Sequence, residues 1–360
     1  MSETVVVGGG VIGLTSAYLL AKQGISVTVI DQRQIGQEAS WAGAGMLPPV
    51  LRDGPKSLKT ITKQSAAKWP ELSQELLSHT GIDNGYRNCG AIQISLENPE
   101  HLSKDAELWN QAGAPTAQLD NQGIQEQAIS PEITSAFRLP TMSQVRNPRH
   151  LKALKEACFS YGVNFIENQA VRQFETSGDN VKSVVLENRK IHADSFVIST
   201  GAWTNDLLKA FSLQIEIIPI RGQIVLMKLP NPHITHIIED GPRYLVPRED
   251  GHLLIGSTEE NVGFVKATTE NGVQGLIDFA IQVVPQLAEA KVVKSWSGLR
   301  PRALRGYPYI GQSEELTNLT VAAGHFRDGL LQSPVTAQLV AELVTGHSSS
   351  IDLAPLNTFN

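Results

Sequence analysis

The stretch Thr4-Val5-Val6-Val7-Gly8-Gly9-Gly10-Val11-Ile12-Gly13 decides the fold of this chain. Its β-branched start indicates a buried parallel strand, and Gly8, Gly10 and Gly13 fit the pattern G-x-G-x-x-G. In this motif the first glycine allows a tight turn, and the second lets a pyrophosphate approach the backbone. The third lets the following helix pack closely on the strand. The motif therefore predicts a nucleotide-binding turn at the start of the chain.

The segments that follow place this motif in its usual context. Residues 14–22 are rich in Ala and Leu and lack proline, which predicts a helix that ends near Gly24. Residues 26–30 predict a second strand, and Asp31 closes it. An acid at this position accepts hydrogen bonds from ribose hydroxyls, while the helix N-terminus attracts phosphates. This order of elements predicts a dinucleotide site rather than a glycine-rich turn that binds nothing.

The first unit leaves open whether the dinucleotide is NAD or FAD. The segment EASWAGAGMLP at residues 38–48 is rich in small side chains. Such a segment lets backbone lie against an extended ligand, and a flavin that lies past the pyrophosphate needs this. On composition alone, an ordinary loop explains the segment equally well.

Composition narrows the classes of function. The chain has 360 residues, 41% hydrophobic and 18% charged, so it can bury a core and is long enough for two domains. A net charge of −6 argues against nucleic acid or an anionic membrane as partner. No apolar run reaches the ~20 residues that span a bilayer, so we expect a soluble, cytoplasmic protein. Two cysteines cannot form a disulfide framework, and nine histidines show no metal-ligand spacing, so no metal is expected.

The rest of the chain changes pattern near its middle. Helices are predicted over residues 57–80 and 147–161, and strands over residues 88–95, 163–166 and 194–200. A hairpin is predicted over residues 170–176 and 181–187, and a polar, irregular stretch over residues 113–129. From residue 215 the strands 215–220, 223–227, 243–247 and 253–256 predict a second, antiparallel sheet. A strand over residues 319–323, a glycine turn and a helix over residues 333–344 then repeat the opening pattern.

Six further motifs are AGML at residues 44–47, STGAW at 199–203, YLVPR at 244–248, GST at 256–258, GLRP at 298–301 and GHFRDG at 324–329. With them the chain resembles the FAD-dependent amine and amino-acid oxidases of the D-amino-acid oxidase family, most of all the thiamin-pathway glycine oxidases. The resemblance covers nearly the whole chain, and the last three motifs together are its most specific part.

The resemblance implies an α/β fold with two parts. One is a doubly wound FAD-binding domain, discontinuous in sequence, made of residues 1–86, 141–210 and 297–360. The other is an inserted α+β substrate-binding domain built on an antiparallel sheet, made of residues 87–140 and 211–296.

The resemblance also implies FAD as the cofactor. By likeness the residues in contact with it would be Gly8, Gly10, Val11, Ile12, Gly13, Asp31, Gln32, Ala39, Ser40, Ala44, Gly45, Met46, Val171, Gly201, His325, Phe326, Arg327, Asp328, Gly329, Leu330 and Leu331. The last seven would place a helix N-terminus at the flavin's pyrimidine end, where it stabilises the negative charge of reduced flavin. Related sarcosine oxidases hold their flavin through a cysteine near the C-terminal part of the chain. Because Cys89 and Cys158 lie elsewhere, we expect non-covalent FAD.

The implied reaction is oxidative deamination of glycine and other small amino acids, such as sarcosine and D-alanine. The products would be the keto acid (glyoxylate from glycine), ammonia or an amine, and hydrogen peroxide, with hydride transfer to flavin N5 and a role in thiazole synthesis. The expected partners are the amino acid and O2, and the family suggests a homotetramer. The alternatives are a broader D-amino-acid oxidase or dehydrogenase, an NAD-dependent dehydrogenase, and a dinucleotide-binding subunit without catalysis.

Four residues are candidates for contact with the substrate. Arginine binds a carboxylate bidentately, and the family motif points to Arg300, with Tyr244 donating a hydrogen bond to the same carboxylate. The alternatives are a structural ion pair for Arg300 and a sheet position with its hydroxyl in water for Tyr244. Arg327 either reaches substrate or flavin or holds its own turn. Met46 is a pocket residue by likeness, although methionine is more often core filling.

Two residues depart from the family pattern. Glu259 stands where a methionine is expected; facing the site, it would bind the amine, and otherwise it points to solvent. Trp41 stands where a small hydroxyl residue is expected, and it either closes off the site or packs between domains.

Overall fold

One layer of the fold is a six-stranded sheet with the strand order β19-β20-β13-β1-β2-β9. Its strands are β1 (Glu3–Val7), β2 (Ser26–Ile30), β9 (Asn164–Ile166), β13 (Ser195–Ile198), β19 (Tyr309–Gln312) and β20 (Leu319–Ala323). Neighbouring strands are parallel, except that β19 runs antiparallel to β20. The computed structural model in which this architecture is observed describes residues 3–211, 213, 215–229 and 234–357.

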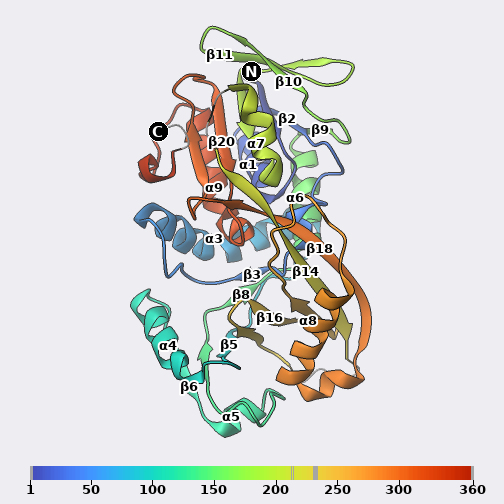
Figure 1. The fold of residues 1–360 in the computed structure, drawn as a ribbon. Coiled ribbons are helices and arrows are strands. Elements are labelled where there is room, and N and C mark those ends of the chain that lie inside the picture. The colour runs from blue at the N-terminus through green and yellow to red at the C-terminus, as the bar shows by residue number, and fades with distance from the viewer. Residues whose placement is uncertain (1–2, 212, 214, 230–233, 358–360) are drawn as a thin grey trace.

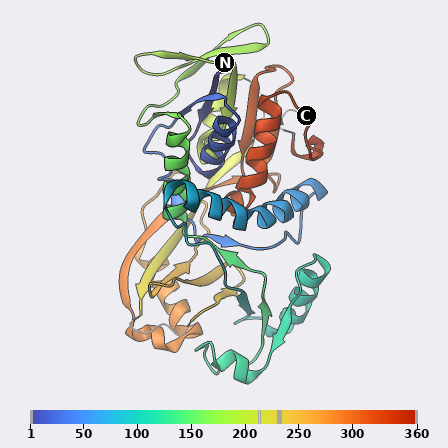
Figure 2. The same ribbon diagram turned by 180° about the vertical axis from the view of Figure 1, so that it is seen from behind.

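This sheet is covered on both faces because its strands are apolar on both faces. In β1, Val6 packs into one core, while Val5 and Val7 pack into another. The helices of the first core are α1 (Val11–Lys22), α3 (Lys56–Thr80), α6 (Asn147–Ser160) and α9 (Gly329–Val344). The other core contains β10 (Gln173–Ser177), β11 (Asn180–Val185), β12 (Lys190–His192) and α7 (Thr204–Leu208). Figure 2 shows α3 crossing between this layer and the rest of the molecule.

The second layer is an eight-stranded sheet with the order β18-β14-β17-β16-β15-β5-β7-β6. Its strands are β5 (Ala91–Ile94), β6 (Ala117–Leu119), β7 (Ala136–Leu139), β14 (Ile217–Lys228), β15 (Ile237–Asp240), β16 (Arg243–Pro247), β17 (His252–Gly256) and β18 (Lys291–Ala303). Only β5 and β15 are parallel neighbours in it. The helix α8 (Glu270–Val283) packs on one face and closes a separate hydrophobic core.

Two long strands, β14 and β18, join the two layers (Figure 1). They pair over twelve residues of β14, from Ile217 opposite Ala303 to Lys228 opposite Lys291. Ile217 and Ala303 pack in the core of the first sheet, whereas Val225 and Met227 pack in the core of the second. Residues near the middle of this ribbon therefore lie between the two cores.

The expected α/β fold is confirmed, and several expected elements need correction. Residues 113–129 are not all irregular, because they contain β6 and α5 (Asn121–Gln125). The two strands expected over residues 215–227 are one strand, because Arg221 and Gly222 continue the ladder opposite Leu299 and Gly298. The last helix begins at Gly329 rather than at Ser333. The remaining α-helices and strands of the described residues are α2 (Ala39–Ala42), β3 (Met46–Leu47), β4 (Arg87–Asn88), α4 (Leu102–Gln111) and β8 (Ser143–Gln144).

The division into two domains stays a prediction. Its boundary at residue 297 falls inside β18, which contributes to both layers. The expected segments also include residues 1–2, 212, 214, 230–233 and 358–360, which lie outside the described residues. In the part of the chain that the structure describes, no helix combines the length and the apolar character needed to cross a membrane.

Candidate active site

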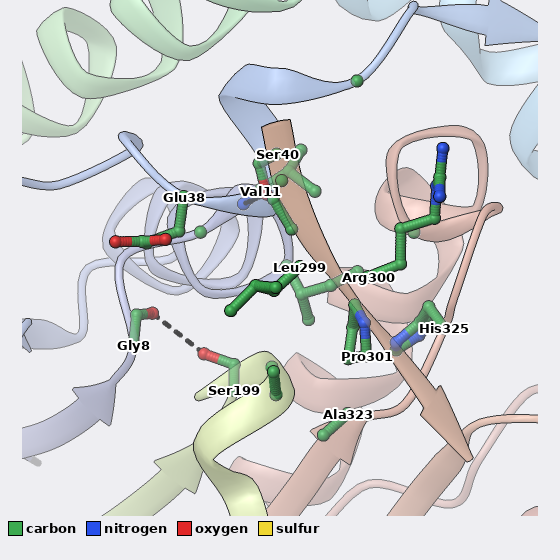
Figure 3. Close-up of a pocket in the computed structure, with 18 of the residues that line it drawn as sticks. Gly8, Val11, Glu38, Ser40, Ser199, Leu299, Arg300, Pro301, Ala323 and His325 are labelled. Carbon is green, nitrogen blue, oxygen red and sulfur yellow. Dashed lines mark hydrogen bonds between the residues drawn. The ribbon is translucent and has the colours of Figure 1, made fainter. Parts of the chain in front are cut away.

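The turn between β1 and α1 holds three glycines in different surroundings. A Cβ on Gly8, where φ is +105°, would lie 2.5 Å from the carbonyl oxygen of Ser199, and one on Gly13 would lie 1.9 Å from that of Gly8. Ser199 Oγ donates a hydrogen bond to the Gly8 carbonyl (2.9 Å; Figure 3). A Cβ on Gly10 would meet only Ser40 Oγ, at 3.2 Å. The turn is thus packed tightly at two glycines and open at the third, as the approach of a pyrophosphate requires.

The carboxylate of Asp31, just after β2, is fixed by main-chain donors. It accepts hydrogen bonds from the N–H groups of Gly9 and Arg33, both at 2.8 Å. Burial raises the pKa of Asp31, and these two hydrogen bonds oppose the rise. The side chain stands near the N-terminus of α1, where a dinucleotide places its ribose hydroxyls.

The small-residue segment that contains α2 and β3 is held over the N-terminus of α1 by polar anchors. Ser40 Oγ accepts the N–H of Val11 (2.9 Å), and Asn147 Nδ2 donates to the Ser40 carbonyl (2.7 Å). Arg248 Nη2 donates to the carbonyl of Ala44 (2.7 Å), and burial lowers the pKa of Arg248 to about 10. Asn147 Oδ1 is buried without a hydrogen-bond partner among the described residues.

The turn before α9 brings a helix N-terminus to the same region. Phe326 has φ +51°, which bulky residues rarely adopt, and its N–H donates to the carbonyl of Pro301 (2.9 Å). Burial lowers the pKa of His325 to about 3, so this imidazole is neutral near pH 7. Burial also raises the pKa of Asp328 to about 6. Because α9 is sixteen residues long, its positive dipole end favours negative charge in front of the turn.

Arg300 enters the region from β18. In Figure 3 it stands between Leu299 and Pro301 on the strand that crosses the site. Its Nη1 donates to the carbonyl of Thr258 (3.2 Å) and its Nη2 to Ser257 Oγ. Among the described residues no carboxylate pairs with this guanidinium. The structural ion pair considered from the sequence is therefore not observed there, and the charge remains available to an anionic ligand.

The second sheet contributes a phenol and a carboxyl. Tyr244 on β16 is buried, with 7% of its surface exposed, and its ring lies so close to Gly256 that a Cβ there would be 2.5 Å from it. Glu239 on β15 is directly opposite Tyr244 and accepts a hydrogen bond from Gln93 Nε2. Glu239 was not among the residues predicted from the sequence. The signal that could have found it is the pair of charged side chains, Glu239 and Asp240, directly after the apolar pair Ile237 and Ile238 in one strand.

These groups line one cavity of about 640 Å³. Of the residues expected at the site, those that line it are Gly8, Gly10, Val11, Ile12, Asp31, Gln32, Ala39, Ser40, Ala44, Gly45, Met46, Val171, Gly201, Tyr244, Arg300, His325, Phe326, Arg327, Asp328, Gly329 and Leu330. Gly13 and Leu331 are not brought to it. Gly13 packs beneath the turn, and Leu331 lies in the core, where its carbonyl accepts from Trp69 Nε1 (3.0 Å).

The structure also gives the positions of Glu259, Arg327 and Trp41, for which the sequence left two roles open. Glu259 forms ion pairs with Arg327 and with Arg302 (3.6 Å for the latter), so it neither lines the cavity nor points freely into solvent. Arg327 lines the cavity while its guanidinium holds this partner. Trp41 packs edge-on against Trp296, with ring centroids 5.6 Å apart, and does not line the cavity. Packing between elements is therefore the alternative that the geometry supports for Trp41.

Comparison with known proteins places this geometry in a family. Residues 3–343 match the family described as FAD dependent oxidoreductase, the DAO family. The chain belongs to that family. It is 34% identical to glycine oxidase of Pseudomonas aeruginosa, over 99% of this chain and 98% of that one. It is also 30% identical to the bifunctional protein ThiO/ThiG of Synechocystis, over 95% of this chain and 51% of that one. The crystal structure of glycine oxidase from Geobacillus kaustophilus matches with a TM-score of 0.95, at 31% identity, over 100% of this chain and 99% of that one.

The cofactor of this FAD-dependent oxidoreductase family is FAD, and the residues of the cavity fit it. The open backbone at Gly10 suits a pyrophosphate, Asp31 suits a ribose, and the helix N-terminus at Gly329 suits the electron-rich end of a flavin. Neither cysteine lines the cavity, which is consistent with the prediction of non-covalent FAD.

Proposed function

We propose that the protein oxidises glycine and other small primary or secondary amino acids, such as sarcosine and D-alanine. The products are the keto acid (glyoxylate from glycine), ammonia or the amine, and hydrogen peroxide. FAD bound in the cavity would supply the acceptor for the hydride lost from the substrate α-carbon, and O2 would be the final electron acceptor and leave as peroxide. The amine loses a proton in the same oxidation, and water hydrolyses the resulting imine.

The observation that carries this proposal is the unpaired guanidinium of Arg300 in the cavity. A small amino acid offers little besides a carboxylate and an amine, so its carboxylate must supply much of the binding. Arg300 presents the matching cation, held by the carbonyl of Thr258 (3.2 Å) and by Ser257. Tyr244 lines the same cavity and has a hydroxyl that can donate to a carboxylate. The two side chains would fix the substrate so that its α-carbon is presented in one orientation.

The similarity to named relatives supports the choice of glycine and the biological role. The proteins of Pseudomonas aeruginosa and Geobacillus kaustophilus are named glycine oxidases, and the Synechocystis relative is named ThiO/ThiG. We infer that this chain supplies the oxidised glycine for the thiazole ring of thiamin. A homotetramer and a cytoplasmic location belong to the same proposal.

Removal of Arg300 tests the proposal. Arg300→Ala should raise the KM for glycine by about 30-fold or more, because loss of one partner of a buried charge pair costs at least about 2 kcal/mol. Peroxide release from purified protein is measured with glycine, sarcosine, D-alanine and L-alanine. Lys291→Ala, at the exposed end of the same strand, is the control and should keep the wild-type KM.

Two results would contradict the proposal. Wild-type protein that releases no peroxide from any of these amino acids is not an oxidase of this class. A KM for glycine that stays unchanged in Arg300→Ala would show that the substrate carboxylate does not bind to Arg300. The non-covalent attachment is tested separately by acid precipitation, which should leave the flavin in the supernatant.

A further inference from the structure

One carboxyl group on the second sheet faces the cavity without an ion-pair partner among the described residues. Glu239 lines the cavity, and among the described residues it forms no ion pair. The hydrogen bond observed at its carboxylate comes from the amide of Gln93. Glu239 is half-buried, and a carboxylate withdrawn from water normally has a charged partner or several donors, so this one retains acceptor capacity that the protein itself does not use.

The register of the sheet places Glu239 beside the proposed carboxylate site. Gln93, Glu239, Tyr244 and Gly256 lie directly opposite one another on β5, β15, β16 and β17. Directly opposed residues point to the same face of a sheet. Glu239 and Tyr244 both line the cavity, so this face is the one that faces the ligand. Because Gly256 has no side chain, the ring of Tyr244 leans over it.

The other acids on the cavity wall are already engaged or lie elsewhere. Those acids are Asp31, Glu38, Asp206 and Asp328. Asp31 accepts two main-chain hydrogen bonds, Glu38 pairs with Arg33 and Lys266, and Asp206 pairs with Lys209. Asp328 stands at the start of α9. Glu239 is the carboxyl that shares a sheet face with Tyr244.

An amino acid whose carboxylate meets Arg300 and Tyr244 still has an amine to be recognised. Resting on the proposed function, we propose that Glu239 is a specificity-determining residue that accepts a hydrogen bond from the substrate's amino group. Glu239 thereby favours amino acids over carboxylic acids that lack a donor. The groups that face it are the amide of Gln93, the phenol of Tyr244 and the more distant cations Arg52 and Arg327.

The electrostatics of the site are consistent with this role. Burial raises the pKa of Glu239 to about 7, against the opposing influence of Gln93, Arg52 and Arg327. The carboxylate is therefore formed as the pH rises through neutrality, and an ammonium or amine beside it stabilises the charged form.

The experiment compares Glu239→Gln with wild type, as holoenzymes, using two kinds of ligand. The KM for glycine and for sarcosine should rise by about tenfold, because Gln offers the amine a neutral acceptor in place of a charged one. The Kd for acetate, which has a carboxylate but no amine, is measured from the flavin absorbance change and should stay unchanged. In wild type the KM for glycine should fall as the pH rises through about 7, and this change should be absent from the variant.

Asp240→Asn is the matched control, because the neighbouring carboxyl on β15 pairs with Arg243 and does not line the cavity. It should keep the wild-type KM for both amino acids. An equal loss of acetate and glycine binding in Glu239→Gln would overturn the proposal in favour of a structural role. An unchanged KM for glycine would also overturn it, while leaving the oxidase activity itself intact. Wild-type protein that oxidises none of the amino acids would overturn both this proposal and the proposed function.

Discussion

At the scale of single residues, Gly10 and Gly13 of the first turn should respond differently to replacement by alanine. On Gly10 a methyl group needs only a small shift of one side chain, because φ is −74° and the atom it meets within 4 Å is Ser40 Oγ at 3.2 Å. It would, however, stand on the backbone strip that suits a pyrophosphate. We therefore expect Gly10→Ala to fold and to bind FAD about tenfold more weakly or worse, which is a loss of about 1.4 kcal/mol. Flavin content and a fluorescence titration with FAD measure this.

Gly13→Ala is the comparison for that variant. Its Cβ would lie 1.9 Å from the Gly8 carbonyl, so helix α1 would have to shift away from β1. We expect this variant to lose folded structure by far-UV circular dichroism, not merely cofactor affinity. Equal FAD affinities in Gly10→Ala and wild type would show that the phosphates do not pass this glycine.

Cavity residues were predictable where a motif fixes their spacing. Gly8, Gly10 and Asp31 follow from local rules for a strand, a turn and a helix, and all three line the cavity. Glu239 was not predictable in the same way, because its position depends on the pairing of β15 with β16 and β5. Ion pairs between distant segments, such as Arg327 with Glu259, are equally invisible to local patterns.

At the scale of elements, the ribbon of β14 and β18 sets the position of Arg300. The guanidinium lies against Gly222 of β14, where a Cβ would be 2.1 Å from Nη1. Gly222→Ala should therefore displace Arg300 and raise the KM for glycine by about tenfold or more, a loss of about 1.4 kcal/mol, although Arg300 itself is unchanged. Steady-state peroxide assays measure this KM.

The control for that variant is Gly275→Ala in α8, where nothing lies within 4 Å of the added Cβ. It should leave the KM unchanged and slightly stabilise the helix. If Gly222→Ala also keeps the wild-type KM, the guanidinium can move without loss, and its observed position does not matter for substrate binding.

The same ribbon explains which elements escaped prediction. The first five residues of β18 are exposed, so the strand lacks the alternation of buried and exposed side chains that marks a half-buried strand. Arg221 and Gly222 interrupt the apolar run of β14, yet the ladder opposite β18 continues through them. Long-range pairing therefore overrides the local signal in both strands. The strands β1 and β2 were predictable because both of their faces are buried and apolar.

At the scale of the whole molecule, the cavity exists because β14 and β18 of the second sheet extend into the core of the first sheet. The first sheet brings the glycine turn, Asp31 and the start of α9, and the second brings Tyr244 and Glu239. The change along the chain from strand–glycine–helix units to a run of strands allowed two structural parts to be predicted. The contact between them could not be derived from local spacing, because it depends on the length of two paired strands.

The packing of the helices on the first sheet leads to a prediction about acid. His150 of α6 is fully buried, its ring is 4.7 Å from that of Trp69, and its Nε2 has no hydrogen-bond partner among the described residues. Burial lowers its pKa to about 3, whereas the unfolded chain has the ordinary value near 6.5. The contribution of neutral His150 is thus fully present above about pH 6.5. It is lost as the pH falls toward 3, because only the unfolded state takes up the proton in that window. The slope is about 1.4 kcal/mol per pH unit.

We would test this by urea unfolding of the holoenzyme in excess FAD at several values of pH between 4.5 and 6.5. The readout is the change of the unfolding free energy with pH. His150→Leu should flatten that change even though the variant differs in absolute stability, because its side chain binds no proton. Leu154→Ala, in the same helix and the same core, should lower stability by about 2–5 kcal/mol and keep the wild-type slope. A slope that is equal in wild type and His150→Leu would mean that this imidazole is protonated in the folded protein, and that α6 and α3 accommodate a charge between them.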